Sequence, residues 1–327
     1  MDYLTADSLP WLQGPQQRVR EALQSHRLPH ALLLLSAPGL GAEHLANWIA
    51  ASTLCDSKAS APCGVCASCV LLRADSHPDA YVVRLEEDAQ QIKVDQIRAL
   101  IESLSLSSFR GGYKVAIIEG AESLNTNGAN AFLKTLEEPA GETLLVMVAR
   151  PSHRLPVTVA SRCLRMSLRP PAKSAAEQWL AARAPGVENW DAPLALAGGA
   201  PLLALELQAA GIASLEQEMQ DAIRLMSADA LDVTLLAERW VKSDPVLRLI
   251  WLENWITRRV RAYLRTDTSL QSAEPVRLPA ALLKPKIRAL FELLDAAREF
   301  RRLAPTGLNQ QLALEALLLG GRTALAK

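Results

Sequence analysis

The fold is decided by one stretch, Ser36-Ala37-Pro38-Gly39-Leu40-Gly41-Ala42-Glu43. It follows the apolar run 31–35 and opens a segment, 42–54, that has helical periodicity. A strand, a glycine turn and a helix in this order form the place where the phosphate-binding loop G-x-x-x-x-G-K-[ST] belongs. The stretch therefore predicts an α/β domain with a parallel sheet, although Pro-Gly-x-Gly is also a common way to turn a chain.

The loop lacks the side chains that hold a nucleotide. Lysine normally contacts the β- and γ-phosphates and a hydroxyl binds Mg²⁺, but these two positions hold Ala42 and Glu43. A carboxylate about 4 Å from a phosphate costs on the order of 4 kcal/mol per unit of like charge at an effective dielectric of about 20. We therefore expect Ser36, Gly39, Gly41, Ala42 and Glu43 to form a degenerate loop at which ATP does not bind productively.

A second acidic position supports this interpretation. Residues 114–119, Lys-Val-Ala-Ile-Ile-Glu, have the pattern of a buried strand that ends in a carboxylate, as a Walker B strand does. An ATPase of this kind places a second acid directly afterwards to activate water, and this chain has Gly120 there. Because the loop and the second acidic position both lack the residues that an ATPase needs, we expect an ATPase fold whose site no longer hydrolyses ATP, rather than a divergent enzyme.

Three motifs downstream carry a family resemblance. They are Ala-Asn-Ala-Phe-Leu-Lys-Thr-Leu-Glu-Glu-Pro at 129–139, Leu-Pro-Val-Thr at 155–158 and Ser-Arg-Cys at 161–163. Together they resemble the signature of the clamp-loader subunits of bacterial DNA polymerase III, which are AAA+ proteins. The resemblance covers about the first half of the chain. Since the motor subunits of that family, gamma/tau, keep the lysine loop and the acidic pair, the broken loop indicates the delta-prime branch.

The resemblance implies a non-catalytic subunit. Such a subunit is a structural stator in the pentameric loader that places the sliding clamp on primed DNA, and no intrinsic enzymatic activity is expected of it. The implied partners are delta and gamma/tau, and indirectly the sliding clamp and primer-template DNA. An independent AAA+ ATPase with an atypical P-loop is the alternative, and it predicts measurable ATP affinity in the isolated chain.

Arg162 is the residue for which the resemblance implies active chemistry. In clamp loaders the arginine of the Ser-Arg-Cys triplet projects across a subunit interface to the γ-phosphate held by the neighbour. Arg162 is therefore expected to be a trans arginine finger for the adjacent gamma/tau ATPase, a role worth about 10³–10⁵ in rate elsewhere. The residues alone leave a second interpretation open, an ordinary helix-end arginine that pairs with a carboxylate.

Two further nucleotide contacts of the family are missing. Its ATPases place a phosphate-reading threonine after the strand at 143–148, where this chain has Ala149 and Arg150. They also begin the lid helix with Gly-Ser-x-Arg, and the corresponding segment 199–202 ends in Leu202. The resemblance therefore adds two losses to those of the loop.

Four of the five cysteines have the spacing C-x7-C-x2-C-x2-C, namely Cys55, Cys63, Cys66 and Cys69. Two overlapping C-x2-C steps let thiolates converge on a tetrahedral ion with Zn–S near ~2.3 Å, and four sulfurs describe a structural site. Disulfides and free thiols are the alternatives, and disulfides are unusual in a reducing cytosol. We predict a structural zinc module at about 55–69, which the clamp-loader family also carries. A zinc-dependent DNA-binding protein is a third hypothesis, which the formal net charge of +0 disfavours.

Length and composition bound the domains and the location. A chain of 327 residues exceeds the size of one core, so we expect more than one domain. The resemblance implies three domains. Residues 1–169 are expected to form an AAA+ nucleotide-binding-like domain that contains the zinc module. Residues 170–210 are expected to form a small helical lid, and residues 211–327 a helical collar for oligomerisation. No apolar run approaches the ~20 residues of a membrane span, and residues 1–4 lack a signal-peptide pattern. We expect a cytoplasmic protein at the nucleoid and replisome.

Overall fold

The chain folds into two compact units. The computed structural model describes residues 8–86, 89, 91–151, 155–227, 232–243, 245–266, 285–303 and 309–325. Residues 1–185 and 199–203 form the sheet unit, and residues 186–198 and 204–327 form the helical unit. The three-domain division expected above stays a prediction, and residues 1–4, used for the signal-peptide argument, lie outside the described residues. Within the described residues, no helix is both long enough and apolar enough to cross a membrane.

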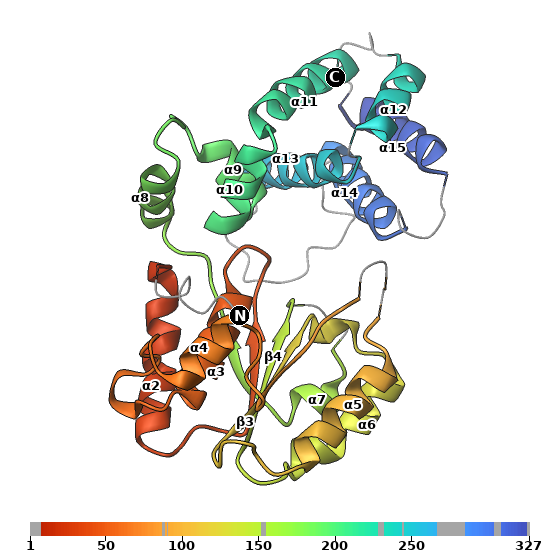
Figure 1. The fold of residues 1–327 in the computed structure, drawn as a ribbon. Helices are drawn as coiled ribbons and strands as arrows, with labels where there is room; N and C mark the ends of the chain where they lie inside the picture. The colour runs from red at the N-terminus through yellow and green to blue at the C-terminus, as the bar shows by residue number, and fades with distance from the viewer. Residues whose placement is uncertain are drawn as a thin grey trace. The chain divides into compact units, whose positions relative to one another are not determined.

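The sheet unit is built on five parallel strands (Figure 1). In chain order these are β1 (Ala31–Leu35), β2 (Ala80–Val83), β3 (Lys114–Glu119), β4 (Thr143–Ala149) and β5 (Leu164–Ser167). Their order in the sheet is β2-β3-β4-β1-β5, so β1 lies inside the sheet and β5 at one edge. The loop that follows β1 therefore leaves the carboxyl edge of the sheet, where α/β proteins bind ligands. The expected α/β fold of the AAA+ type is confirmed.

Helices cover both faces of the sheet (Figure 1). One face packs against α5 (Val94–Ser105), α6 (Thr126–Glu137) and α7 (Val157–Ala160). Alternate residues along the strands supply this core, for example Ala31 and Leu33 of β1. On the opposite side lie α2 (Gln13–Gln24) and α3 (Ala42–Leu54), and α3 is buried along most of its length. The unit also contains η1 (Pro10–Leu12), η2 (Lys58–Ser60), α4 (Ala67–Arg73), η3 (Ala121–Ser123) and α8 (Lys173–Arg183).

A buried lysine closes the end of α5. Lys114, at the start of β3, is 4 % exposed. Its ammonium group donates to the carbonyl of Leu104 and, at 2.6 Å, to that of Leu106. These carbonyls belong to the unpaired end of the helix, so Lys114 satisfies acceptors that would otherwise be buried without partners.

Lys114→Met is therefore expected to lower the free energy of unfolding by about 1–3 kcal/mol, because the thioether fills the space but cannot donate. Urea unfolding followed by circular dichroism measures the change. The matched control is Lys134→Met, which replaces an exposed lysine of α6 and should leave stability nearly unchanged. An equal effect of the two variants would contradict the capping role.

The helical unit contains the remaining helices. They are α9 (Asp191–Leu196), α11 (Ile212–Ser227), α12 (Val233–Lys242), α13 (Pro245–Thr266), α14 (Pro285–Leu303) and α15 (Gln310–Leu325), while α10 (Pro201–Ala209) begins in the sheet unit. Their core is apolar and includes the fully buried Trp240 and Trp251. Glu218 binds both Arg248, at 2.8 Å, and Arg239, at 3.4 Å. This pairing joins α11 to α12 and α13.

Candidate functional site

The loop between β1 and α3 keeps the backbone of a phosphate-binding loop. Gly39 and Gly41 have φ values of 77° and 81°, in the left-handed region that glycine adopts without strain. The N–H of Ser36 donates to the carbonyl of Ala149 at the end of the neighbouring β4, with an N···O distance of 3.0 Å. Gly41 then caps the N-terminus of α3. The two glycines and this backbone hydrogen bond therefore define the turn that leads from β1 into α3.

Residues from the start of α10 lie directly against this loop. The N–H of Leu202 donates to the carbonyl of Gly39 at 3.2 Å. A Cβ atom placed on Gly39 would collide with Leu203, so the backbone at 202–203 touches the loop itself. All these residues belong to the sheet unit. Leu202 thus presents an apolar side chain beside the loop, with a methyl carbon 3.5 Å from where a Cβ of Gly41 would lie.

Apolar residues from the N-terminal segment complete the packing around the loop. A Cβ atom on Gly41 would lie 2.8 Å from a methyl carbon of Leu9, which is itself fully buried. The indole N–H of Trp11 donates to the carbonyl of Leu40 at 2.9 Å. Leu40 is also fully buried. The loop is therefore held by the protein's own side chains on several sides.

The electrostatic environment of the loop is acidic. Ala42 is 1 % exposed and contributes no charge, whereas Glu43 is exposed in the first turn of α3. Glu119 ends β3, and burial raises its pKa, with a further increase from the negative charge of Glu43. Arg84, with its Nε 3.5 Å from a Glu119 oxygen, acts in the opposite direction. Glu43 and Glu119 thus place two interacting carboxyl groups near the loop, and Arg84 offsets part of their charge.

Ala149, which the structure places inside β4 as its last residue, and Arg150 carry no side-chain hydroxyl. Ala149 is buried, and its carbonyl is occupied by Ser36. The N–H of Arg150 donates to a Glu122 oxygen at 3.1 Å, and its guanidinium lies 3.6 Å from the other oxygen. The arginine side chain is thus engaged with a carboxylate of the same unit.

Arg162 lies between α7 and β5 and is paired within the chain. Its Nε donates to Glu137 Oε1 at 2.7 Å and its Nη2 donates to the same oxygen. Its Nη1 donates to the carbonyl of Thr158 at 2.8 Å. The side chains are 34 % and 50 % exposed, respectively, so the pair lies at the surface. Sequence reasoning did not identify Glu137 as the partner, although it lies in the quoted motif at 129–139.

Two exposed apolar side chains flank Arg162. Val157 on α7 is 78 % exposed, and Leu164, the first residue of β5, is 54 % exposed. An arginine beside exposed apolar residues has the composition that protein interfaces favour. The finger role itself stays a prediction.

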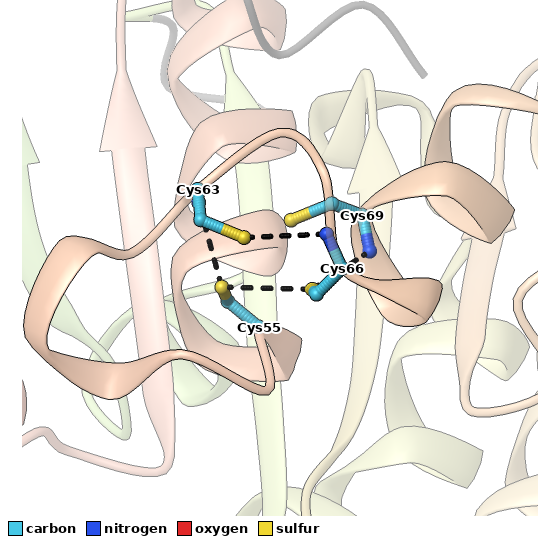
Figure 2. Close-up of side chains that lie close together, drawn as sticks. All are labelled: Cys55, Cys63, Cys66 and Cys69. Atoms are coloured by element: carbon cyan, nitrogen blue, oxygen red, sulfur yellow. Dashed lines mark hydrogen bonds between the residues drawn. The ribbon is translucent and has the colours of Figure 1, made fainter.

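The four cysteines of the predicted zinc module converge (Figure 2). Their sulfur atoms all lie within 4.8 Å of one another, and the sulfurs of Cys55 and Cys66 are 3.8 Å apart. Four sulfurs at about 2.3 Å from a tetrahedral ion would be about 3.8 Å from each other, so the cluster fits a metal ion. Disulfides are excluded in this structure, because all four cysteines are free.

Local backbone structure holds the cluster. Cys55 follows the last residue of α3, and Cys66 is the N-cap of α4, whose first turn contains Cys69. The N–H groups of Cys63, Cys66 and Cys69 each donate to a cysteine sulfur at 3.4 Å. These backbone hydrogen bonds therefore orient the sulfur atoms toward one another without the help of an ion.

The thiols differ in their protonation. Hydrogen bonds from the backbone of Val65 and Cys66 lower the pKa of Cys63 to about 6. Burial raises the pKa of Cys55, and burial raises that of Cys69 to about 12. A cation is the usual compensation for buried thiolates, and a coordinating thiol is deprotonated outright. The fifth cysteine, Cys163, lies apart from the cluster and donates to the carbonyl of Val159 at 3.2 Å.

Comparison with known proteins gives consistent matches. A family described as "DNA polymerase III, delta subunit" matches residues 13–172, which include the loop, the four cysteines and Arg162. The DNA polymerase III subunit delta' of Pseudomonas aeruginosa is 34% identical over 322 residues, covering 96% of this chain and 97% of that protein. The Escherichia coli subunit delta' is 30% identical over 318 residues, covering 95% and 94%. The crystal structure of a gamma subunit-related protein of Thermotoga maritima matches with a TM-score of 0.42 at 15% identity, covering 94% of this chain and 99% of that one.

Proposed function

Because the chain belongs to the delta-prime subunit family of the DNA polymerase III clamp loader, we propose that it is the loader's non-hydrolysing subunit. In this proposal it binds no ATP productively and has no enzymatic activity of its own. It serves as a stator within a pentameric loader, and the neighbouring gamma/tau subunits hydrolyse ATP. The loader as a whole places the sliding clamp on primed DNA.

The observation that carries this proposal is the state of the loop between β1 and α3. The lysine and hydroxyl positions hold Ala42 and Glu43, and Glu43 acts together with Glu119 to make the site acidic. Leu202 and Leu203 also lie against Gly39. The charge of the loop and the packing of Leu202 and Leu203 thus oppose triphosphate binding independently. A variant that corrects only the charge, or only the packing, would not restore a normal nucleotide site.

Arg162 is proposed to complete the neighbour's ATP site. Its ion pair with Glu137 is surface-exposed, and such pairs contribute at most about 1 kcal/mol, so the guanidinium can exchange a carboxylate for a phosphate at little cost. A phosphate also accepts the forked donors of arginine well. The flanking Val157 and Leu164 supply apolar surface for the neighbouring subunit.

Cys55, Cys63, Cys66 and Cys69 are proposed to hold one structural zinc ion. The set of four thiols offers zinc its preferred soft ligands and leaves no open coordination position, so no catalytic role is assigned to it. The ion would fix the segment between α3 and α4 to the rest of the sheet unit.

The remaining assignments follow from the family. We propose that the chain contacts delta and one gamma/tau subunit, and reaches the sliding clamp and primer-template DNA only through the assembled loader. The lid at 170–210 and the collar at 211–327 stay proposals, as does a cytoplasmic location at the replisome. The apolar core of the helical unit is consistent with a rigid collar domain.

Titration of the isolated chain with a fluorescent ATP analogue and Mg²⁺ tests the degenerate site. We expect no saturable binding at micromolar nucleotide, because the loop lacks a cation and carries a carboxylate. Fluorescence anisotropy measures the affinity. Micromolar binding, or ATP turnover by the chain alone, would contradict the proposal and favour an independent AAA+ ATPase.

The double variant Ala42→Lys/Glu43→Thr provides the matched comparison. It restores both phosphate-site groups, and we expect at least a roughly tenfold gain in affinity over the wild type, which corresponds to about 1.4 kcal/mol. Affinity should remain below that of a working P-loop, because Leu202 and Leu203 still lie against Gly39. No gain in a variant that retains its thermal stability would show that the lost charges are not what excludes nucleotide.

A further inference from the structure

A cavity of about 550 Å³ lies beside the cysteine module, away from the loop and from Arg162. Its walls come from the end of α2, the last turn of α3, the segment 58–62 and Tyr113. All of these belong to the sheet unit. A volume in this range is typical of sites that take small molecules.

The charged groups that line the cavity are all basic in type. They are Arg20 from α2 and Lys58 from η2, and the imidazole of His26 lies in the turn that follows α2. None of its lining residues, all of which the structure describes, carries a carboxylate. Lys58 donates one N–H to the carbonyl of Thr53 at 2.7 Å, and an ammonium group has two more donors. The cavity is therefore suited to an anion.

Ser52 supplies a second, independent observation. It lines the cavity from α3 and is only 2 % exposed. Its hydroxyl oxygen is buried and has no hydrogen-bond partner among the described residues. A buried hydroxyl without a partner is unfavourable, and a ligand atom that accepts its proton would remove that penalty.

Apolar side chains cover the rest of the wall. Leu23, Leu28 and Pro62 offer aliphatic surface, and Tyr113 offers an aromatic ring. Such a wall favours a flat apolar body, while the basic groups and Ser52 favour an anionic head. One ligand with both parts would satisfy the whole lining.

We propose that this cavity binds a small phosphate ester that carries a flat ring. The phosphate would contact Lys58 and accept a hydrogen bond from Ser52, and the ring would pack against Tyr113 and Leu28. Part of the wall, residues 58–62, lies between Cys55 and Cys63, so the cysteine cluster shapes one side of the site. The proposal does not depend on the clamp-loader assignment, because the cavity shares no residue with the degenerate loop or with Arg162.

Isothermal titration calorimetry of the full chain in phosphate-free buffer tests the proposal with 1-naphthyl phosphate as the probe. We expect one saturable site per chain. Inorganic phosphate has the head without the ring, and 1-naphthol has the ring without the charge, so each should bind at least about tenfold more weakly than the ester. Equal affinity for 1-naphthol would overturn the anionic part of the proposal, and equal affinity for inorganic phosphate would overturn the ring.

Two variants assign the binding to this cavity. Ser52→Ala removes a hydroxyl that has no hydrogen-bond partner in the described part of the chain, so folding should be unaffected while the ester binds about tenfold more weakly. Lys58→Gln keeps a donor for the Thr53 carbonyl but removes the charge, and should weaken the ester without changing the affinity for 1-naphthol. The matched control is Ser103→Ala in α5, whose hydroxyl donates to the carbonyl of Ala99 outside the cavity. No heat at millimolar ester, or equal affinity in all three variants, would overturn the proposal.

Discussion

Replacement of Arg162 by alanine is expected to abolish hydrolysis at the ATP site of the adjoining subunit in a reconstituted loader. An arginine supplied in trans stabilises the charge that develops on the transferring phosphoryl group, and its loss costs about 10³–10⁵ in rate in other phosphoryl-transfer systems. The DNA- and clamp-stimulated ATP turnover of the complex should fall by at least the fraction that this one ATP site contributes to the total. Steady-state phosphate release, measured with the variant and the wild type at equal subunit concentrations, gives the comparison.

Two further variants separate the finger from a structural role. Arg165→Ala on β5 removes a second exposed arginine three residues away and should leave turnover unchanged. Glu137→Gln removes the carboxylate that holds Arg162 and keeps the guanidinium, so turnover should be retained. None of the three should shift the thermal midpoint by more than a degree or two, because exposed ion pairs contribute little to stability. Unchanged turnover in the Arg162→Ala complex would rule out the finger.

The sheet unit could be predicted closely because its signals are local. The predicted bounds 31–35 and 42–54 match β1 and α3, since each is an apolar run or stripe between clear turn residues. The helix that contains most of the motif at 129–139, α6, begins at Thr126. Asn125 is its N-cap, and its side chain accepts a hydrogen bond from the N–H of Gly128 at 2.7 Å. The strand predicted at 114–119 matches β3, whereas the strand predicted at 143–148 continues one residue further, to the small Ala149.

Contacts between distant segments could not be predicted from these patterns. Leu203 touches Gly39 across more than 160 positions, and the indole of Trp179 donates to the carbonyl of Ser8. The sequence pattern of each segment does not indicate which distant residues it contacts. The short helix α4 was also missed, because it lies within the cysteine spacing and only seven residues form it. The cysteine cluster could be found because its spacing alone restricts where the sulfurs can go.

Arg162 and Glu137 illustrate the same limit within the candidate site. The motifs identify both segments, but only the fold brings the carboxylate of α6 to the guanidinium after α7. The two interpretations of Arg162, an arginine paired with a carboxylate and an arginine finger, are therefore compatible, because they describe the same side chain outside and inside the complex. It pairs with a carboxylate in the chain by itself, and we propose that it binds a phosphate in the complex. The weakness of an exposed ion pair is what makes these two states compatible.

Replacement of Cys69 by serine is expected to remove zinc from the chain and to open the segment between α3 and α4. Structural zinc supplies apparent binding energies of about 10–16 kcal/mol in zinc-finger peptides, far more than the few apolar contacts of a short module. Apart from the cysteines themselves, most residues of the module are exposed, with Val65 82 % exposed, so apolar burial adds little to its stability. Elemental analysis should find close to one zinc per wild-type chain and almost none in the variant.

Limited trypsin digestion reports the opening directly, because Lys58 lies inside the module with its ammonium group bonded to the carbonyl of Thr53. Cleavage after Lys58 should accelerate in Cys69→Ser and in wild-type protein treated with a chelator, and mass spectrometry identifies the fragments. The control is Cys163→Ser, which alters a buried cysteine outside the cluster and keeps a donor for the Val159 carbonyl. It should retain zinc and protection, since Cys163 is not one of the four cysteines that converge. A zinc-free wild type in which Lys58 stays protected would mean that packing and hydrogen bonds alone hold the four thiols together.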